Sequence, residues 1–200
     1  MKIEDVLQDI SNILQKNNVI WGLGGSQLLQ IYGIYSNPRD IDLWVNFSDM
    51  DVVKNIFSQY KINDTSISLP EEYYLKIEYN GIELDFISCF MVKPNQNKFA
   101  YYISPNDVVY RSVCGKRKIP CTLLENWYII YKLLKRNEKA EIIETFFKEN
   151  NINSKILIDS LHSNIPRYVK KEIKDFLKSY YSGLQLSLMV YFENDCSSDE

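Results

Sequence analysis

The sequence is poor in the residues that hold zinc or build disulfide frameworks. Its 200 residues include one histidine, His162, and four cysteines, none of them in a CxxC pair (Cys89, Cys114, Cys121 and Cys196). Structural zinc sites and disulfide-stapled domains use closely spaced cysteine and histidine residues. We therefore predict reduced thiols and no zinc cluster, as is usual in the cytoplasm.

Long apolar runs and a strong excess of charge are also missing. No stretch of about 18 apolar residues is present to span a membrane, and residues 1–20 lack the apolar core of a signal peptide. The net charge of −3 gives no overall electrostatic basis for wrapping nucleic acid. We expect a soluble, cytoplasmic protein that does not bind membranes.

The residues that are present favour an ordered core. Hydrophobic residues make up 46% of the chain and aromatic residues 14%, which is typical of a globular protein. Strand and helix patterns alternate up to about residue 105, and helical patterns dominate from Leu124 onward. We predict an α/β fold with a mixed sheet and flanking helices in residues 1–105, followed by a helical bundle in residues 106–200.

Local patterns predict the individual elements. Apolar spacing indicates helices at 3–16, 27–33, 49–60, 124–136, 139–150, 154–164 and 167–181. Strands are expected in 17–25, 40–47, 73–90, 99–110 and 116–124, with Asn80-Gly81 as the turn of a hairpin. Ser26 is expected to cap the helix that follows it, and Ser48 with Asp51 forms a capping-box pattern.

Two aspartates in the strand at 40–47 stand out because they share one face. Side chains alternate along a strand, so Asp40 and Asp42 project to the same side, roughly 6 to 7 Å apart. Asp85 is a third acid, set in the apolar run IELDFIS of the predicted hairpin. Neighbouring carboxylates repel unless a cation neutralises them, and carboxylate oxygens favour Mg²⁺ or Mn²⁺. The three acids are therefore candidate metal ligands.

A glycine turn lies just upstream of these acids. Gly24 and Gly25 allow close approach of backbone to a ligand, and the helix start that follows offers free N–H groups to phosphate. Ser26 adds a hydroxyl donor. Gly22 and Gly24, with an acid about twenty residues on, partly imitate a dinucleotide-binding fold, but Gln27 stands where the third glycine belongs.

The combination of these motifs resembles the DNA polymerase beta-like nucleotidyltransferase superfamily. Its signature is Gly-Gly-Ser, roughly a dozen residues, Asp-apolar-Asp, and a third acid on a later strand. Here the match is Gly24-Gly25-Ser26, then Asp40-Ile41-Asp42, then Asp85, within the first 90 residues or so. The two-part layout is similar to small antibiotic nucleotidyltransferases, including lincosamide- and aminoglycoside-modifying enzymes, and to toxin-like members of abortive-infection systems.

The resemblance implies a catalytic domain at 1–105 that transfers NMP from an NTP to an acceptor hydroxyl with Mg²⁺ or Mn²⁺. It implies that Asp40, Asp42 and Asp85 are catalytic metal ligands and that Gly24, Gly25 and Ser26 bind the nucleotide. Relatives often place a lysine of the helical half on the triphosphate, so Lys132 is a candidate. Arg136, one turn further along the same predicted helix, is another, and Arg39 beside the acids is a third.

Several alternatives remain open at this point. The acceptor is expected to be a small molecule such as an antibiotic, but a tRNA or a protein hydroxyl is possible, as is an inactive nucleotide- or partner-binding module. Aromatic residues could stack a base, although aromatics at helical spacing more often belong to a core. The members of this set are Tyr101, Tyr102, Trp127, Tyr128 and Tyr131. A basic run near the C-terminus fits a solvated helix face better than an RNA-binding surface (Arg167, Lys170, Lys171, Lys174 and Lys178).

Overall fold

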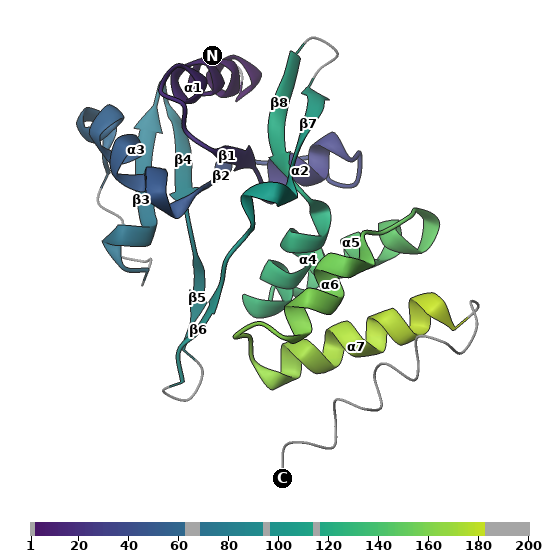
Figure 1. The fold of residues 1–200 in the computed structure, drawn as a ribbon. Coiled ribbons are helices and arrows are strands. Elements are labelled where there is room, and N and C mark those ends of the chain that lie inside the picture. Colours follow the sequence, from purple (N-terminus) through teal and green to yellow (C-terminus); the bar gives the residue numbers. More distant parts are fainter. Residues whose placement is uncertain (1–2, 63–68, 94–96, 114–116, 183–200) are drawn as a thin grey trace.

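The computed structural model describes residues 3–62, 69–93, 97–113 and 117–182 (Figure 1). The helices are α1 (Ile3–Lys16), α2 (Gly25–Ile31), α3 (Met50–Ile56), α4 (Leu124–Leu133), α5 (Asn137–Glu149), α6 (Ser154–Leu161) and α7 (Arg167–Tyr181). The strands are β1 (Trp21–Leu23), β2 (Ile41–Val45), β3 (Tyr74–Tyr79), β4 (Ile82–Ile87), β5 (Phe90–Val92), β6 (Phe99–Tyr101), β7 (Val108–Val113) and β8 (Arg117–Thr122).

A mixed sheet forms the centre of the N-terminal part. Its strand order is β3-β4-β2-β1-β8-β7; β2 runs parallel to β4 and β1 parallel to β8, whereas the remaining neighbours are antiparallel. Strands β5 and β6 form a separate ribbon that leads toward the helices α4 to α7, which lie together below the sheet (Figure 1). The predicted mixed α/β fold with a helical C-terminal part is confirmed.

The sheet continues past the predicted boundary at residue 105. Strands β7 and β8 follow that residue in the chain, yet β8 pairs with β1 at Leu23 and Cys121. The change from strands to helices therefore falls at Leu124, where α4 begins. The extended segment at 99–122 contributes β7 and β8 to the sheet. Alternating apolar residues predict strands, but they do not show which edge of the sheet those strands join. The division into two domains stays a prediction.

The predicted hairpin at Asn80-Gly81 is confirmed. Tyr79 pairs with Ile82 across a two-residue turn, and Asn80 and Gly81 have φ angles of 55° and 78°. Positive φ at both central residues defines the type I′ turn, whose twist matches that of the paired strands. This hairpin carries Asp85 on β4 to its position beside β2.

Both predicted serine caps are wrong. Helix α2 begins two residues early, at Gly25 with Gly24 as its N-cap, so Ser26 lies inside the helix and its hydroxyl donates to Asp40. Helix α3 begins at Met50 after a short 3₁₀ turn, with Asp49 as its N-cap, and the Ser48 hydroxyl donates to Asp49 instead of accepting from a helix N–H. In each case the helix begins beside another residue, and the serine hydroxyl is hydrogen-bonded to a carboxylate instead of capping a helix N–H.

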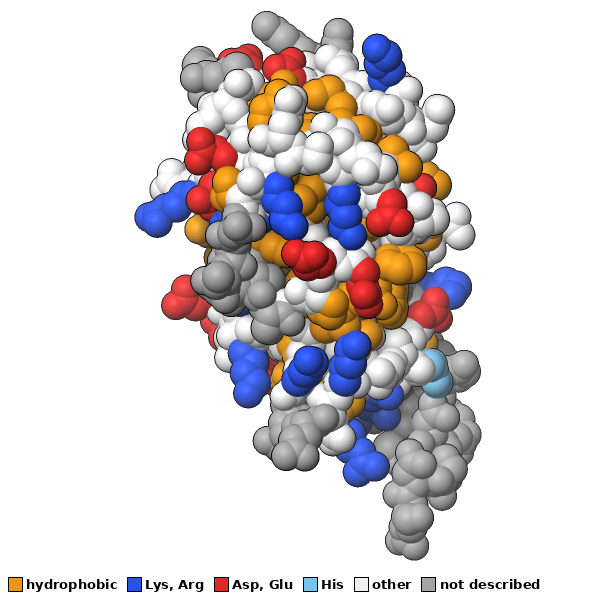
Figure 2. Space-filling model, turned by 90° about the vertical axis from the view of Figure 1, so that its left-hand side faces the viewer, with side chains coloured by type: hydrophobic (Ala, Val, Ile, Leu, Met, Phe, Trp, Pro, Cys, Tyr) orange, Lys and Arg blue, Asp and Glu red, His pale blue; other side chains and the backbone are white. Residues whose placement is uncertain are grey.

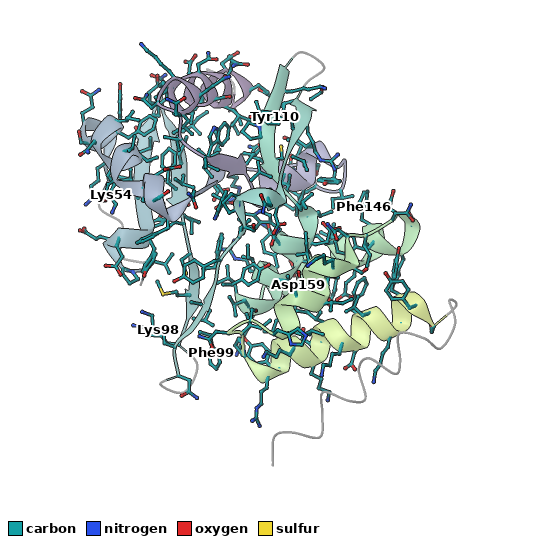
Figure 3. The ribbon with its side chains drawn as sticks, viewed as in Figure 1. Lys54, Lys98, Phe99, Tyr110, Phe146 and Asp159 are labelled. Carbon is teal, nitrogen blue, oxygen red and sulfur yellow. The ribbon has the colours of Figure 1, made fainter. Side chains whose placement is uncertain are left out.

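The helical part packs directly against the glycine turn of the sheet. A Cβ atom at Gly24 would lie 2.0 Å from the Trp127 ring of α4, so only glycine allows this approach. The Trp127 indole N–H donates to Thr122 Oγ1 at 2.7 Å. A second junction joins α2 to α5, where Tyr32, just after α2, and Phe146 meet edge-on with ring centroids 5.4 Å apart. Phe146 is labelled on α5 in Figure 3. The glycine turn and α2 are thereby held against α4 and α5.

The outer surface carries charges of both signs. Figure 2 shows acidic and basic side chains interspersed over the middle of one face, with lysine and arginine more frequent toward its lower end. Within the described ranges no helix has the length and apolar character needed to cross a membrane. Cys89 and Cys121 are free and buried, as predicted for reduced thiols, and the other two cysteines lie outside the described residues.

Candidate functional site

Strand pairing brings the predicted acids together. Strands β2 and β4 are parallel neighbours, and Asp42 is in direct register with Asp85. Asp40 lies two residues before Asp42, immediately ahead of β2. Residues in register on adjacent strands point to the same face of a sheet. The three carboxylates, separated by up to 45 residues in the chain, therefore share one face of two central strands.

Electrostatic coupling among these acids is strong. Burial, followed by the charges of Asp40 and Asp85, raises the pKa of Asp42 to about 7, and the positive charges of Arg136 and Lys139 act in the opposite direction. Burial also raises the pKa of Asp85. The raised pKa values of Asp42 and Asp85 suit a bound cation, which would stabilise the charged forms of both carboxylates.

Asp85 has a neighbour that the sequence did not suggest. The Tyr74 hydroxyl of β3 donates a hydrogen bond to Asp85 Oδ1, and this bond lowers the pKa of Asp85 against the effect of burial. Tyr74 lies on the strand antiparallel to β4, opposite Ile87. The hydrogen bond fixes the orientation of the carboxyl group.

The glycine turn touches the central acid. The Gly24 N–H donates to the Asp42 carbonyl at 2.9 Å, and Gly25 has a φ of +58°, in the left-handed region. A Cβ atom at Gly25 would lie 1.7 Å from Asp42 Oδ2. Ser26 follows in the first turn of α2, and its hydroxyl donates to Asp40 Oδ1 at 3.4 Å. The predicted Gly24-Gly25-Ser26 segment is thus packed against both acids of β2.

Two cations face the acids from the helical part. Arg136 is the N-cap of α5 and Lys139 lies in its first turn, and the charges of both act on Asp42. A pocket of about 550 Å³ is lined by residues 135–139. Among the described residues, neither cation forms an ion pair with a carboxylate. Two uncompensated positive charges beside a pocket and a helix N-terminus favour an anionic ligand.

Lys132, the first predicted phosphate ligand, has partners elsewhere. Its ammonium group pairs with Glu144 at 3.0 Å and Glu172 at 3.2 Å. Burial lowers the pKa of Lys132, but the hydrogen bonds to these two glutamates outweigh it and raise the pKa. Lys132 therefore holds α4, α5 and α7 together. Arg39 is exposed in the loop before β2.

The placement of Arg136 differs from the sequence prediction. Helix α4 ends at Leu133, and Lys135 adopts a positive φ of 56°. The Arg136 N–H donates to the Tyr131 carbonyl and the Lys135 N–H to the Lys132 carbonyl, the bonding pattern of a Schellman motif. Arg136 thus begins a new helix instead of extending α4. Glycine is the usual residue at the position that Lys135 occupies after the helix, so the sequence gave no indication that α4 ends there.

Lys139 was not among the residues predicted for the site, and Tyr131 was named only as an aromatic residue that could stack a base or belong to the core. Lys139 has no sequence motif of its own, and the spacing of Tyr131 among other aromatics favours a place in the core. The sequence did contain one indication that the two cations act together. Arg136 and Lys139 are three residues apart, a spacing that places both side chains on one side of the first turn of a helix. The chain reversal at Lys135 turns that side toward Asp42.

The carboxylate oxygens of Asp40, Asp42 and Asp85 are the kind of ligand that a hard divalent cation prefers. In the part of the chain that the structure describes, no group of three or more His, Cys, Asp or Glu side chains forms a ready-made metal cage. Mg²⁺ rarely uses such a cage, because it retains water and is usually held by one or two carboxylates together with substrate phosphates. The partly buried Asp42, coupled to Asp40 and Asp85, supplies such carboxylates.

Comparison with known structures identifies the fold as that of the nucleotidyltransferases. One match is a Thermotoga maritima protein with a provisional nucleotidyltransferase assignment, at 23% identity and TM-score 0.52, covering 73% of this chain and 92% of that one. Another is the antibiotic-resistance factor ANT(2'')-Ia, at 12% identity and TM-score 0.54, covering 90% of this chain and 93% of that one. The lincosamide adenylyltransferase LnuA matches at 12% identity and TM-score 0.49, over 72% of this chain and 97% of LnuA. No protein-family model and no curated protein sequence matches the chain.

Proposed function

We propose that this protein is a metal-dependent nucleotidyltransferase that moves an NMP group from an NTP to a hydroxyl group of a small molecule. The observation that carries this proposal is the arrangement around Asp42. Its carboxylate is coupled to those of Asp40 and Asp85 and faces the cations Arg136 and Lys139. Transfer of a nucleotidyl group requires acids that can hold a metal ion and, facing them, cations that can hold the phosphates.

Each group has a defined role in this proposal. Asp40 and Asp42 hold the Mg²⁺ or Mn²⁺ ion, and Asp85 orients the acceptor hydroxyl and accepts its proton. When bound, the metal neutralises charge on the phosphates and acidifies the acceptor hydroxyl. The acceptor oxygen bonds to the α-phosphorus as the bond to pyrophosphate breaks. Gly24 and Gly25 let the turn that borders the nucleotide site pack against Trp127 and Asp42, and Ser26 holds Asp40 in place.

A small-molecule acceptor is favoured by one structural neighbour. ANT(2'')-Ia, which shares the fold over most of both chains, is described as an antibiotic-resistance factor with substrate-regulated conformational dynamics. The acceptor would enter between the sheet and the helical part, because Asp85 lies on the sheet and the cations lie on α5. We propose that the acceptor is a hydroxylated antibiotic-like molecule.

The test is transfer of label from each of the four α-labelled NTPs, with and without Mg²⁺, to a panel of aminoglycosides, lincosamides, tRNA and the protein itself. Label on a small molecule that depends on Mg²⁺ and on Asp42 supports the proposal. Label on tRNA or protein alone would show that the acceptor is a macromolecule, whereas the nucleotidyl-transfer reaction would stand as proposed. Absence of both transfer and NTP binding would identify the chain as an inactive module with this fold.

Substitution of the cations is expected to separate nucleotide binding from stability. Arg136→Gln and Lys139→Gln should each weaken NTP binding roughly tenfold, because each removes one charge-assisted bond to phosphate. Lys132→Met should leave NTP affinity unchanged and lower the free energy of unfolding by about 1 to 3 kcal/mol, because Glu144 and Glu172 both lose their ion pair with Lys132. Calorimetric titration and urea unfolding of the three variants measure both quantities. If only Lys132→Met lost NTP binding, Lys132 would be the residue that binds the triphosphate.

A further inference from the structure

Tyr131 has a hydroxyl group without a hydrogen-bond partner among the described residues. The residue is 0% exposed, and its oxygen forms no hydrogen bond within the described structure. A buried polar group left unpaired destabilises a fold, so nearly all such groups are satisfied by protein, water or ligand. The neighbouring Tyr128, also 0% exposed, follows this rule, because its hydroxyl donates to Glu144 at 2.8 Å. An unpaired hydroxyl at Tyr131 therefore calls for a partner beyond the described residues, such as a bound ligand.

The surroundings of this hydroxyl are those of the proposed active site. The pKa of Tyr131 is raised by burial, then by the charge of Asp42, with smaller contributions from Asp40 and Tyr35, whereas Arg136 lowers it. The hydroxyl thus remains protonated and acts as a donor. The groups that influence it are the same acids and the same cation that define the site around Asp42.

Lys139 is held next to Tyr131 without a carboxylate partner among the described residues. Its ammonium group lies 5.3 Å from the ring centroid of Tyr35 and 5.4 Å from that of Tyr131. Such cation–π contacts orient an ammonium group and leave its positive charge uncompensated. Burial and the charge of Arg136 lower the pKa of Lys139, and Asp42 and Asp40 oppose them. A bound anion would relieve this unfavourable pairing of two cations.

We propose that the Tyr131 hydroxyl donates a hydrogen bond to an oxygen of the pyrophosphate portion of the bound NTP. The rings of Tyr35 and Tyr131 hold Lys139 against the same portion. This inference rests on the proposed function and adds two tyrosines to its nucleotide-binding residues. A phosphate oxygen is the fitting partner because it accepts hydrogen bonds only and carries the charge that Arg136 and Lys139 attract.

The experiment compares Tyr131→Phe with Tyr128→Phe as a matched control on the same helix. Tyr131→Phe removes an unpaired hydroxyl, so the melting temperature of the free protein should stay the same or rise. Its affinity for NTP and for inorganic pyrophosphate, each with Mg²⁺, should fall by a similar factor of roughly 10 to 100. Tyr128→Phe breaks the bond to Glu144, so it should lower the melting temperature and leave both affinities unchanged.

Calorimetric titration of the wild type and both variants decides between the outcomes. Unchanged affinities in Tyr131→Phe, or a loss for NTP with none for pyrophosphate, would overturn the inference while leaving the proposed function in place. A fall in melting temperature with unchanged affinities would show that the hydroxyl has a structural role. A wild type that binds neither NTP nor pyrophosphate would overturn the proposed function and this inference together.

Discussion

Asp42→Asn is expected to abolish nucleotidyl transfer. The same substitution should raise the stability of the metal-free protein at pH 8. Transfer should fall by at least about a thousandfold, because a central ligand for the metal and its electrostatic effect are lost. Stability should rise because the ionised Asp42 carboxylate is buried beside Asp40 and Asp85, and burial and these charges raise its pKa to about 7. An amide at this position carries no charge to desolvate or repel.

The stability effect has a defined pH dependence. An acid whose pKa is raised from its ordinary value of 3.8 to about 7 on folding destabilises the folded protein wherever it is ionised. The penalty is absent below about pH 4, grows between pH 4 and 7, and is complete above pH 7. It is on the order of a few kcal/mol, so the melting temperature should rise by roughly 5 to 10 °C at pH 8 and remain unchanged at pH 4.

Thermal unfolding in EDTA between pH 4 and pH 8.5, together with the label-transfer assay, measures both effects. Asp51→Asn is the control, because Asp51 is exposed on α3 and pairs with Lys54 at the surface. That variant should change neither quantity by much. A gain in stability of equal size at all pH values would contradict the electrostatic explanation, and intact transfer would remove Asp42 from the catalytic residues.

Gly25→Ala is expected to be the most damaging change in the glycine turn. Its φ of +58° disfavours alanine, and the new Cβ would lie 1.7 Å from Asp42 Oδ2. The two effects together should lower the free energy of unfolding by about 2 to 5 kcal/mol and displace the Asp42 carboxylate. NTP binding in the presence of Mg²⁺ should consequently be lost. Urea unfolding and calorimetric titration measure the two losses.

Gly33→Ala separates steric clash from backbone strain. Gly33, just beyond the end of α2, has a comparable φ of +72°, but nothing lies within 4 Å of its Cβ position. This variant should lose only about 1 to 2 kcal/mol and retain NTP binding. Combining Gly25→Ala with Asp42→Ala should recover part of the stability, since the clashing carboxylate is gone. Equal losses in the Gly25 and Gly33 variants would show that contact with Asp42 is unimportant.

Sequence patterns predicted the elements well where the signal is local. The Asn80-Gly81 turn requires positive φ at two successive residues, and few other sequences meet that need. The amphipathic spacing of residues 3–16 predicted α1 with the observed ends. Helix ends were less predictable, because Ser26 and Ser48 resemble caps in sequence but donate to carboxylates in the fold.

The sequence by itself determined the acids and the glycine turn of the candidate site. Asp40, Asp42, Gly24 and Gly25 lie within 19 residues of one another, and alternation along a strand sets the common face of the two acids. Asp85 could be named because an acid in an apolar strand is unusual. That it stands in register with Asp42 depends on the pairing of β2 with β4, which is non-local.

Only the tertiary structure decided which cations face those acids. Lys132 and Arg136 are four residues apart, and a continuous helix would have placed them on one side. The reversal at Lys135 separates them, so that Lys132 meets Glu144 while Arg136 and Lys139 face Asp42. The unpaired hydroxyl of Tyr131 likewise becomes visible only when every neighbouring group is in place. Strand alternation and turn chemistry depend on adjacent residues, whereas the choice of a charge partner depends on how distant helices pack.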